Sequence, residues 1–224
     1  MKSDSLLLIM IARCTQIKSI KWLAYIFVLW GCSGTPASTY YMLTPSEVTQ
    51  DQTHKRLTHL EQGPLLGIGP IHISAHIDRP QLVSRVHTHR LLVHELHRWG
   101  SDLHAQLMTQ IYDDFSRTIH PKGVIRYPWV RATRPQKQLI IHLHRLDGVL
   151  NDALRIDCSW KLIDVTQDSL LTQGRFRHSI SIESQSGESD FDAYVRAMNI
   201  GVERVIETLS NHLEVALHPK KKTK

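Results

Sequence analysis

The sequence predicts an α+β fold, a single domain in which two main amphipathic helices pack on a largely antiparallel sheet. Three observations lead to this prediction. Apolar and polar residues alternate with a period of two along several segments, which is typical of strands with one buried and one solvated face. Two other segments repeat apolar residues every three or four positions, which is typical of amphipathic helices. The predicted elements follow the order strands, helix, strands, helix, and not the strict alternation of parallel βαβ folds.

The predicted strands lie on both sides of the first helix. Residues 87–89 separate two of them and form the expected turn of a hairpin. Residues 46–64 are polar and are expected to form a loop. In the run 154–162 Cys158 falls on the apolar face, which favours a small core residue over a reactive thiol. The predicted strands cover residues 39–43, 65–73, 81–86, 90–96, 139–143, 154–162 and 175–182.

The two helices are predicted from apolar spacing and from their caps. Ser101 is the expected N-cap of the first helix, which runs to about Ile119. Ser189 with Asp192 resembles a capping box at the start of the second helix, which ends near Leu217 before Pro219. The apolar stripe of the first helix is Leu103, Leu107, Ile111 and Phe115, and that of the second is Phe191, Val195, Met198, Val202, Val205, Leu209 and Leu213.

The N-terminal segment has the pattern of an export signal. Residues 22–30 are uncharged and apolar, Lys18 and Lys21 precede them, and Gly31-Cys32 follows them. We therefore expect a signal peptide at 1–31, a lipidated tether at 32–38, the folded domain at 39–218 and a basic tail at 219–224. An N-terminal anchor helix that is never cleaved is the alternative, and Met10 is a second candidate start.

Leu29, Gly31 and Cys32 resemble the lipobox of bacterial lipoproteins, although Trp30 is bulkier than usual. Cleavage is expected between Gly31 and Cys32. The thiolate of Cys32 would be the nucleophile that takes a diacylglyceryl group, and the new N-terminus would then be acylated too. Two or more chains give stable anchoring. Ser33 is not the aspartate that favours inner-membrane retention in enterobacterial lipoproteins, so this resemblance implies the outer membrane.

Charge and cysteine content limit the classes of function. The formal net charge of the 224-residue chain is +6, but removal of residues 1–31 leaves 23 basic and 20 acidic residues. No basic stripe with interleaved aromatic residues is present, so nucleic-acid binding is not expected. Without the leader, Cys158 and Cys32 are the remaining cysteines, and Cys32 would be acylated, so no disulfide is expected.

Fifteen histidines raise the hypothesis of a metal site. The pairs His87/His89 and His142/His144 each lie two residues apart, and His94 and His97 are close to the first pair. A zinc site needs three or four converging ligands, whereas His142 and His144 fall on the polar side of their strand. Solvated histidines are the favoured interpretation. No nucleophile, P-loop or dinucleotide motif is present, and the acidic pairs Asp113-Asp114 and Glu188/Asp190 suit helix surfaces, so we expect no enzyme activity and no bound metal.

Three aromatic residues are candidates for contact with a partner or with lipid: Trp99, Tyr127 and Trp129. Trp99 follows Arg98 at the end of a predicted strand, and Tyr127-Pro128-Trp129 is an aromatic group in a predicted loop. The favoured interpretation for all three is a structural role, in the core or in a small satellite cluster. The tail lysines Lys220–Lys222 and Lys224 have a similar pair of interpretations, a solvated charge run or a contact with anionic lipid.

Several segments, taken in their order and spacing over roughly residues 38–217, resemble the ABC-type transport auxiliary lipoproteins, the PqiC-like family. The segments that carry the resemblance are residues 40–45, 68–70, 78–83, 90–91 with Glu95, Arg98 and Trp99, then 127–129, 146–148, Trp160 with Leu162, and 194–198. The histidine-rich stretch 87–104 and the lysine tail depart from the family pattern. No catalytic residues accompany this family.

The resemblance implies a lipid-anchored protein on the periplasmic face of the outer membrane. It would be a non-catalytic subunit that docks the conduit of an MCE-type (mammalian-cell-entry) lipid transport system and supports envelope integrity. The implied partners are a PqiB-like MCE-domain protein, its PqiA-like inner-membrane partner, outer-membrane lipid and further copies of the chain in a homo-oligomer. No cofactor is implied beyond the lipid on Cys32. Two alternatives stay open: a periplasmic metal-dependent hydrolase that uses the histidines, and a lipoprotein that itself binds lipid between helix and sheet.

Overall fold

The computed structural model describes residues 36–44, 64–118 and 123–217. The chain divides into two units, Met1–Ala37 and Ser38–Lys224, and the elements below belong to the second. Among the described helices, none is long and apolar enough to cross a membrane. The elements in chain order are β1 (Thr39–Tyr41), β2 (Leu65–Ile73), β3 (Gln81–His87), β4 (Arg90–Trp99), α3 (Leu103–Thr118), β5 (Gly123–Arg126), the 3₁₀ turn η3 (Arg131–Thr133), β6 (Lys137–Gly148), β7 (Ala153–Asp164), β8 (Ser169–Ser181) and α4 (Asp190–Leu217).

The strands form two sheets. The small sheet has the order β1-β4-β3, and the large one has the order β5-β2-β6-β7-β8. The pairs β3–β4, β6–β7 and β7–β8 are antiparallel, as predicted. The pairs β1–β4, β2–β5 and β2–β6 are parallel, so both sheets are mixed. The predicted α+β class is confirmed, and the parallel pairs involve the N-terminal strands and the short β5.

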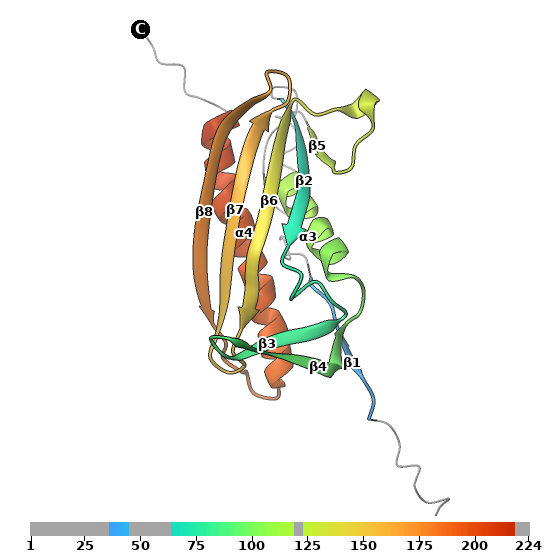
Figure 1. Ribbon diagram of the computed structural model, residues 1–224, viewed down its shortest axis with the longest axis vertical. Helices are drawn as coiled ribbons and strands as arrows, with labels where there is room; N and C mark the ends of the chain where they lie inside the picture. Colours follow the sequence, from blue (N-terminus) through green and yellow to red (C-terminus); the bar gives the residue numbers. More distant parts are fainter. Residues whose placement is uncertain (1–35, 45–63, 119–122, 218–224) are drawn as a thin grey trace, which may run out of the picture. The chain divides into compact units, whose positions relative to one another are not determined.

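Both helices cover the same face of the large sheet (Figure 1). Their apolar stripes belong to the hydrophobic core or pack against it. Leu107 and Phe115 of α3 are completely buried, as are Leu209 and Leu213 of α4. Apart from Val83, the buried apolar side chains of the described residues form a single cluster that includes Cys158. The space between sheet and helices is therefore a packed core, and burial raises the pKa of the Cys158 thiol to about 12, as expected for an unreactive core cysteine.

The caps differ in one respect from the predictions. Ser189 caps α4 as expected, since its Oγ accepts a hydrogen bond from the Asp192 N–H at 3.2 Å. The predicted N-cap Ser101 was wrong by one residue. Asp102 has this role, because its carboxylate accepts a hydrogen bond from the Ala105 N–H at 2.8 Å, and a carboxylate is also favoured at the positive end of the helix dipole.

A close contact between strands requires glycine at position 148, at the end of β6. A Cβ on Gly148 would lie 2.2 Å from the carbonyl oxygen of Ala153 on β7. We expect Gly148→Ala to lower the free energy of unfolding by about 1–3 kcal/mol, because the backbone must shift to admit the methyl group. Gly123→Ala is the matched control, since its Cβ would meet only a flexible leucine methyl at 3.3 Å. Equal losses in urea unfolding of both variants would contradict this prediction.

Candidate docking site

The residues expected to carry the lipid lie outside the described part of the chain. Gly31 and Cys32 precede residue 36, and the basic tail 219–224 follows residue 217. The predictions of cleavage, acylation and a lipid-facing tail therefore remain predictions. The three aromatic candidates, by contrast, are all within described segments.

Trp99 does not join the other two aromatic candidates. Its side chain is only 5% exposed and belongs to the core cluster at the end of β4. Its backbone N–H donates to the carbonyl of Pro80 at 2.7 Å, and the following N–H of Gly100 donates to Tyr41 at 2.8 Å. Trp99 therefore has a structural role in the small sheet and offers almost no surface to a partner.

Tyr127 and Trp129 do lie together, on the segment that connects β5 to β6. Their ring centroids are 5.2 Å apart in an edge-to-face arrangement. Trp129 is half-buried over β2, where a Cβ on Gly67 would come within 2.7 Å of its indole ring. The small residue at position 67 thus provides the space in which the indole packs. Tyr127 is 41% exposed and Val130 is 67% exposed, so the segment presents apolar surface to solvent.

We name residues 127–134 the aromatic segment. Beyond Val130 it carries two exposed arginines, Arg131 and Arg134. Its base is fixed to α3, because the Tyr112 hydroxyl donates to Val124 O at 3.1 Å and the Arg126 guanidinium lies 5.0 Å from the Tyr112 ring centroid. Exposed aromatic, aliphatic and arginine side chains on a firmly held segment are the composition typical of protein-binding surfaces.

The aromatic segment and β1 lie at opposite ends of the domain (Figure 1). The small sheet shares the end with β1, and the turn between β6 and β7 also lies there. Cys32 precedes β1 in the sequence. If the domain is anchored through its N-terminus, the aromatic segment therefore lies at the end of the domain opposite to β1.

The small sheet is joined to the large sheet through the buried carboxylate of Asp147, on β6. Asp147 has no exposed side-chain surface. Arg85 of β3 donates to it through Nε at 2.7 Å and Nη2 at 2.9 Å, and Arg145 donates through Nε at 2.7 Å. His76 Nε2 lies 2.9 Å from its Oδ2. Burial on its own would raise the pKa of Asp147. The hydrogen bonds from Arg85, Arg145 and His76 lower this pKa by more than burial raises it, so the pKa lies below its ordinary value.

Tyr194 joins α4 to the same junction. Its buried hydroxyl donates to Val83 O of β3 at 2.8 Å and accepts from the Gly148 N–H of β6 at 3.0 Å. Burial raises the pKa of Tyr194 above its ordinary value, so the hydroxyl stays neutral and can act as both donor and acceptor. The junction therefore fixes the small sheet to both the large sheet and α4.

The histidines are distributed over several surfaces. His87, His89 and His144 are exposed, as expected, while His142 is half-buried with its ring stacked on His72 at 4.4 Å. His94 and His97 are half-buried as well, and both pack against Phe191, at centroid distances of 4.7 and 3.6 Å. In the described part of the chain, no group of three or more His, Cys, Asp or Glu residues is placed to hold a metal ion.

The acidic pair of α3 differs from its prediction. Asp114 was expected on a polar helix face, but it is buried and paired with Arg117 one turn later. Burial raises the pKa of Asp114, and hydrogen bonding by Arg117 acts in the opposite direction. Glu188, from the second acidic pair, forms an ion pair with Arg196 of α4, with 2.8 Å between Oε2 and Nη2. Both carboxylates thus have structural partners.

A family comparison covers almost the whole of this domain. The model of the ABC-type transport auxiliary lipoprotein component matches residues 41–210. The chain belongs to this family. Its members are auxiliary lipoproteins of a transport-related class, so this chain is a lipoprotein of that class and the expected membrane anchor fits the family. The match begins in β1 and ends within α4, and it includes the junction at Asp147 and the aromatic segment.

Solved structures show the same fold at low sequence identity. An uncharacterised protein is 16% identical, with a TM-score of 0.61, over 80% of this chain and 99% of its own. A Xanthomonas campestris protein of the DUF330 family is 18% identical, with a TM-score of 0.57, over 80% of this chain and 94% of its own. No curated protein matches the sequence significantly. The auxiliary lipoprotein thus shares its architecture with these two proteins.

Proposed function

We propose that this auxiliary lipoprotein is a non-catalytic docking subunit of an MCE-type intermembrane lipid transport system. Acylated Cys32 would hold it at the periplasmic face of the outer membrane. The aromatic segment would contact the outer-membrane end of a PqiB-like conduit, whose inner-membrane partner is PqiA-like. The family match over residues 41–210 is the observation that carries this proposal.

The placement of the aromatic segment supports the proposal. Thr39 lies seven positions after Cys32, with six residues between them, so β1 begins at most about 25 Å from the acylated residue. The aromatic segment lies at the opposite end of the domain from β1 (Figure 1), where a periplasmic partner would meet it. Tyr127, Val130 and Arg131 are all exposed there and have the character of interface anchors.

Co-purification tests the proposal. The full lipoprotein, tagged at its C-terminus and cross-linked in cells, is expected to recover an MCE-domain protein from solubilised membranes. Recovery of the lipoprotein alone, or only with copies of itself, would contradict the docking function. The metal content of the purified protein tests the alternative function, a histidine-dependent hydrolase, because such an enzyme would contain metal in a fixed ratio to the protein.

Paired substitutions test the surface itself. The double variant Tyr127→Ser with Val130→Ser is expected to weaken binding to the partner by roughly thirtyfold, the effect of losing about 2 kcal/mol at an interface hot spot. Its melting temperature should change little, since both side chains are exposed. Val215→Ser is the control, because Val215 is 75% exposed and belongs to α4 and not to the aromatic segment. Undiminished binding of the double variant would remove the aromatic segment from the interface.

A further inference from the structure

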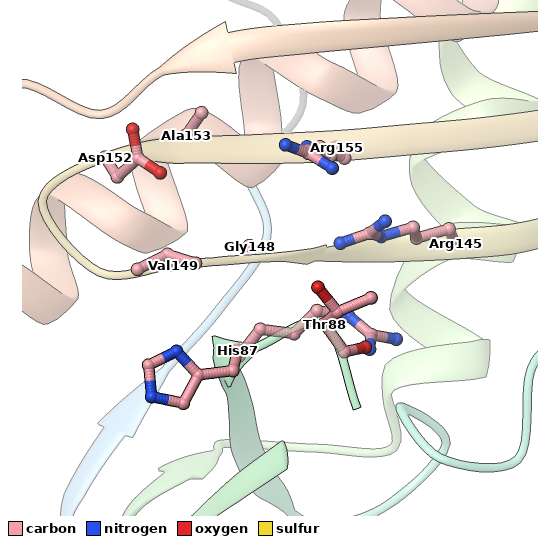
Figure 2. A pocket seen from close by; sticks show the side chains of 9 residues that line it. His87, Thr88, Arg145, Gly148, Val149, Asp152, Ala153 and Arg155 are labelled. Atoms are coloured by element: carbon pink, nitrogen blue, oxygen red, sulfur yellow. The ribbon is translucent and has the colours of Figure 1, made fainter. Parts of the chain in front are cut away.

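A pocket lined by three arginines lies where the small sheet meets the large one. Its volume is about 180 Å³, and Arg85, Arg145 and Arg155 line it together with His87 and Thr88 of the β3–β4 hairpin. Figure 2 shows Arg145 and Arg155 side by side on the neighbouring strands β6 and β7, with His87 and Thr88 across from them. Side chains from three strands therefore converge on one small space.

Two of these arginines are held in place by groups beneath the pocket. Arg85 donates to both oxygens of Asp147, and its Nη1 donates to Thr88 O at 3.0 Å. Arg145 donates to Asp147 through Nε, which leaves its two Nη groups available to a ligand. Because Asp147 is fully buried, it orders both guanidiniums without presenting its negative charge to solvent. A ligand would not have to order these long side chains on binding.

The third arginine has no partner within the part of the chain that the structure describes. Arg155 is exposed on β7, and its guanidinium makes no hydrogen bond or ion pair with another described residue. Around the pocket three guanidiniums face two carboxylates, Asp147 below and Asp152 at the rim, so positive charge is in excess. A guanidinium fork matches the oxygens of a phosphate group in geometry and charge, and the Thr88 hydroxyl adds a further donor.

The position of the pocket indicates which phosphate-bearing ligands it would meet. The β3–β4 hairpin and the β6–β7 turn that border it lie at the same end of the domain as β1 (Figure 1). The tether from Cys32 to Thr39 has a reach of about 25 Å at most. Acylation of Cys32 would therefore keep the arginine pocket near the lipid headgroups of the anchoring leaflet, where anionic phosphates are concentrated.

We propose that the pocket formed by Arg85, Arg145 and Arg155 binds the phosphate of an anionic phospholipid headgroup in the leaflet that anchors the protein. This inference rests on the proposed function only for the membrane anchor, and it does not depend on an MCE-domain partner. Headgroup binding at this end would orient the domain, with the aromatic segment directed away from the membrane. It would also give the acylated chain a second, lipid-selective contact with the bilayer.

Calorimetric titration of the full acylated lipoprotein in neutral detergent tests the proposal. The probes are dihexanoyl phosphatidylglycerol, dihexanoylglycerol, which lacks the phosphate, and inorganic phosphate. The variant Arg155→Gln removes the unpartnered cation and leaves the Asp147 cluster intact. Arg204→Gln is the matched control, since Arg204 lies on α4 and is paired only with Glu207 on the exposed helix surface. Arg155→Lys keeps the charge but removes the planar fork.

We expect phosphatidylglycerol to bind the wild type and the Arg204→Gln control equally. Arg155→Gln should weaken this binding by about tenfold or more, as expected for loss of hydrogen bonds to a charged group, and Arg155→Lys should restore part of it. Any binding of dihexanoylglycerol should be the same for the wild type and the variants. Inorganic phosphate should bind more weakly than the lipid. Inorganic phosphate that binds as tightly as phosphatidylglycerol would overturn the headgroup assignment, and binding independent of Arg155 would overturn the site.

The outcome is separable from that of the proposed function. If the wild-type lipoprotein fails to bind phosphatidylglycerol but still cross-links to an MCE-domain protein, only the arginine pocket is overturned. A functioning pocket without any such cross-link would overturn only the docking function.

Discussion

Replacing Asp147 with alanine is expected to lower the free energy of unfolding by about 3–5 kcal/mol, the usual cost of removing one partner from a buried ion pair. The carboxylate has no exposed surface and accepts hydrogen bonds from Arg85, Arg145 and His76. Its removal leaves two guanidiniums close together without their shared anion. It also loosens the junction between the small sheet and the large sheet. Urea unfolding of the purified protein followed by circular dichroism measures the effect.

The control for this variant is Glu207→Ala. Glu207 forms an exposed pair with Arg204 on α4, with both side chains more than half exposed. Exposed pairs of this kind contribute about 0–1 kcal/mol, so the control should unfold near the wild-type urea concentration. Similar midpoints for Asp147→Ala and the wild type would show that the two sheets do not depend on this carboxylate.

The same cluster predicts a dependence on pH. The pKa of Asp147 in the folded protein lies below its ordinary value, which applies in the unfolded chain. The stabilisation is therefore complete above an unfolded-state pKa of about 4 and is lost as the pH falls through the lower folded-state pKa. Hydrogen bonding from Arg175 likewise lowers the pKa of Asp157 to about 2, so both carboxylates act in the same acidic range. Asp147→Asn should lose less stability than the wild type between pH 7 and pH 3.

Cys32→Ser is expected to abolish lipid attachment and, with it, recovery of the protein in the membrane fraction. A serine hydroxyl cannot replace the thiolate that accepts the diacylglyceryl group, and the acyl chains are what gives a lipoprotein its stable anchoring. Metabolic labelling with a radioactive fatty acid, followed by membrane fractionation, measures both effects. The labelled band should disappear completely.

Cys158→Ala is the matched control for this experiment. Cys158 is fully buried, and burial raises the pKa of its thiol to about 12, so it has no thiolate to acylate at neutral pH. The control should keep the label and remain in the membrane fraction. Labelling of Cys32→Ser at the wild-type level would contradict the assignment of Cys32 as the anchor.

The predicted elements were most accurate where the sequence has a clear period. The stripe of α3 and the alternation in β7 are buried as predicted, and so is the stripe of α4 apart from the half-buried Phe191, since each pattern repeats several times along its segment. The strand β5 was missed because it has only four residues with two adjacent apolar positions, Val124 and Ile125. The parallel pairing of β2 with β5 and β6 was missed too, because alternation identifies a buried face but not the direction of its neighbours.

The candidate site was predictable only in part. The aromatic loop residues Tyr127 and Trp129 come together because they lie two positions apart in sequence, whereas Trp99 belongs to a different sheet. The arginine pocket was not predicted. Its members are distant in sequence, and a register shift in β6 between Leu143 and Arg145 interrupts the alternation that would have placed Asp147. The available signal was an aspartate within a strand, between Leu146 and Gly148, where an acidic residue is unfavourable unless it has partners.

Site-specific photo-cross-linking in living cells tests the docking function most directly. A photoreactive phenylalanine derivative replaces Tyr127 in the full lipoprotein, and the same derivative at Val215 provides the control. Docking through the aromatic segment predicts a light-dependent adduct at position 127 that contains an MCE-domain protein, and no such adduct at position 215. The absence of that protein from the adducts at position 127, or equal yields at both positions, would contradict it.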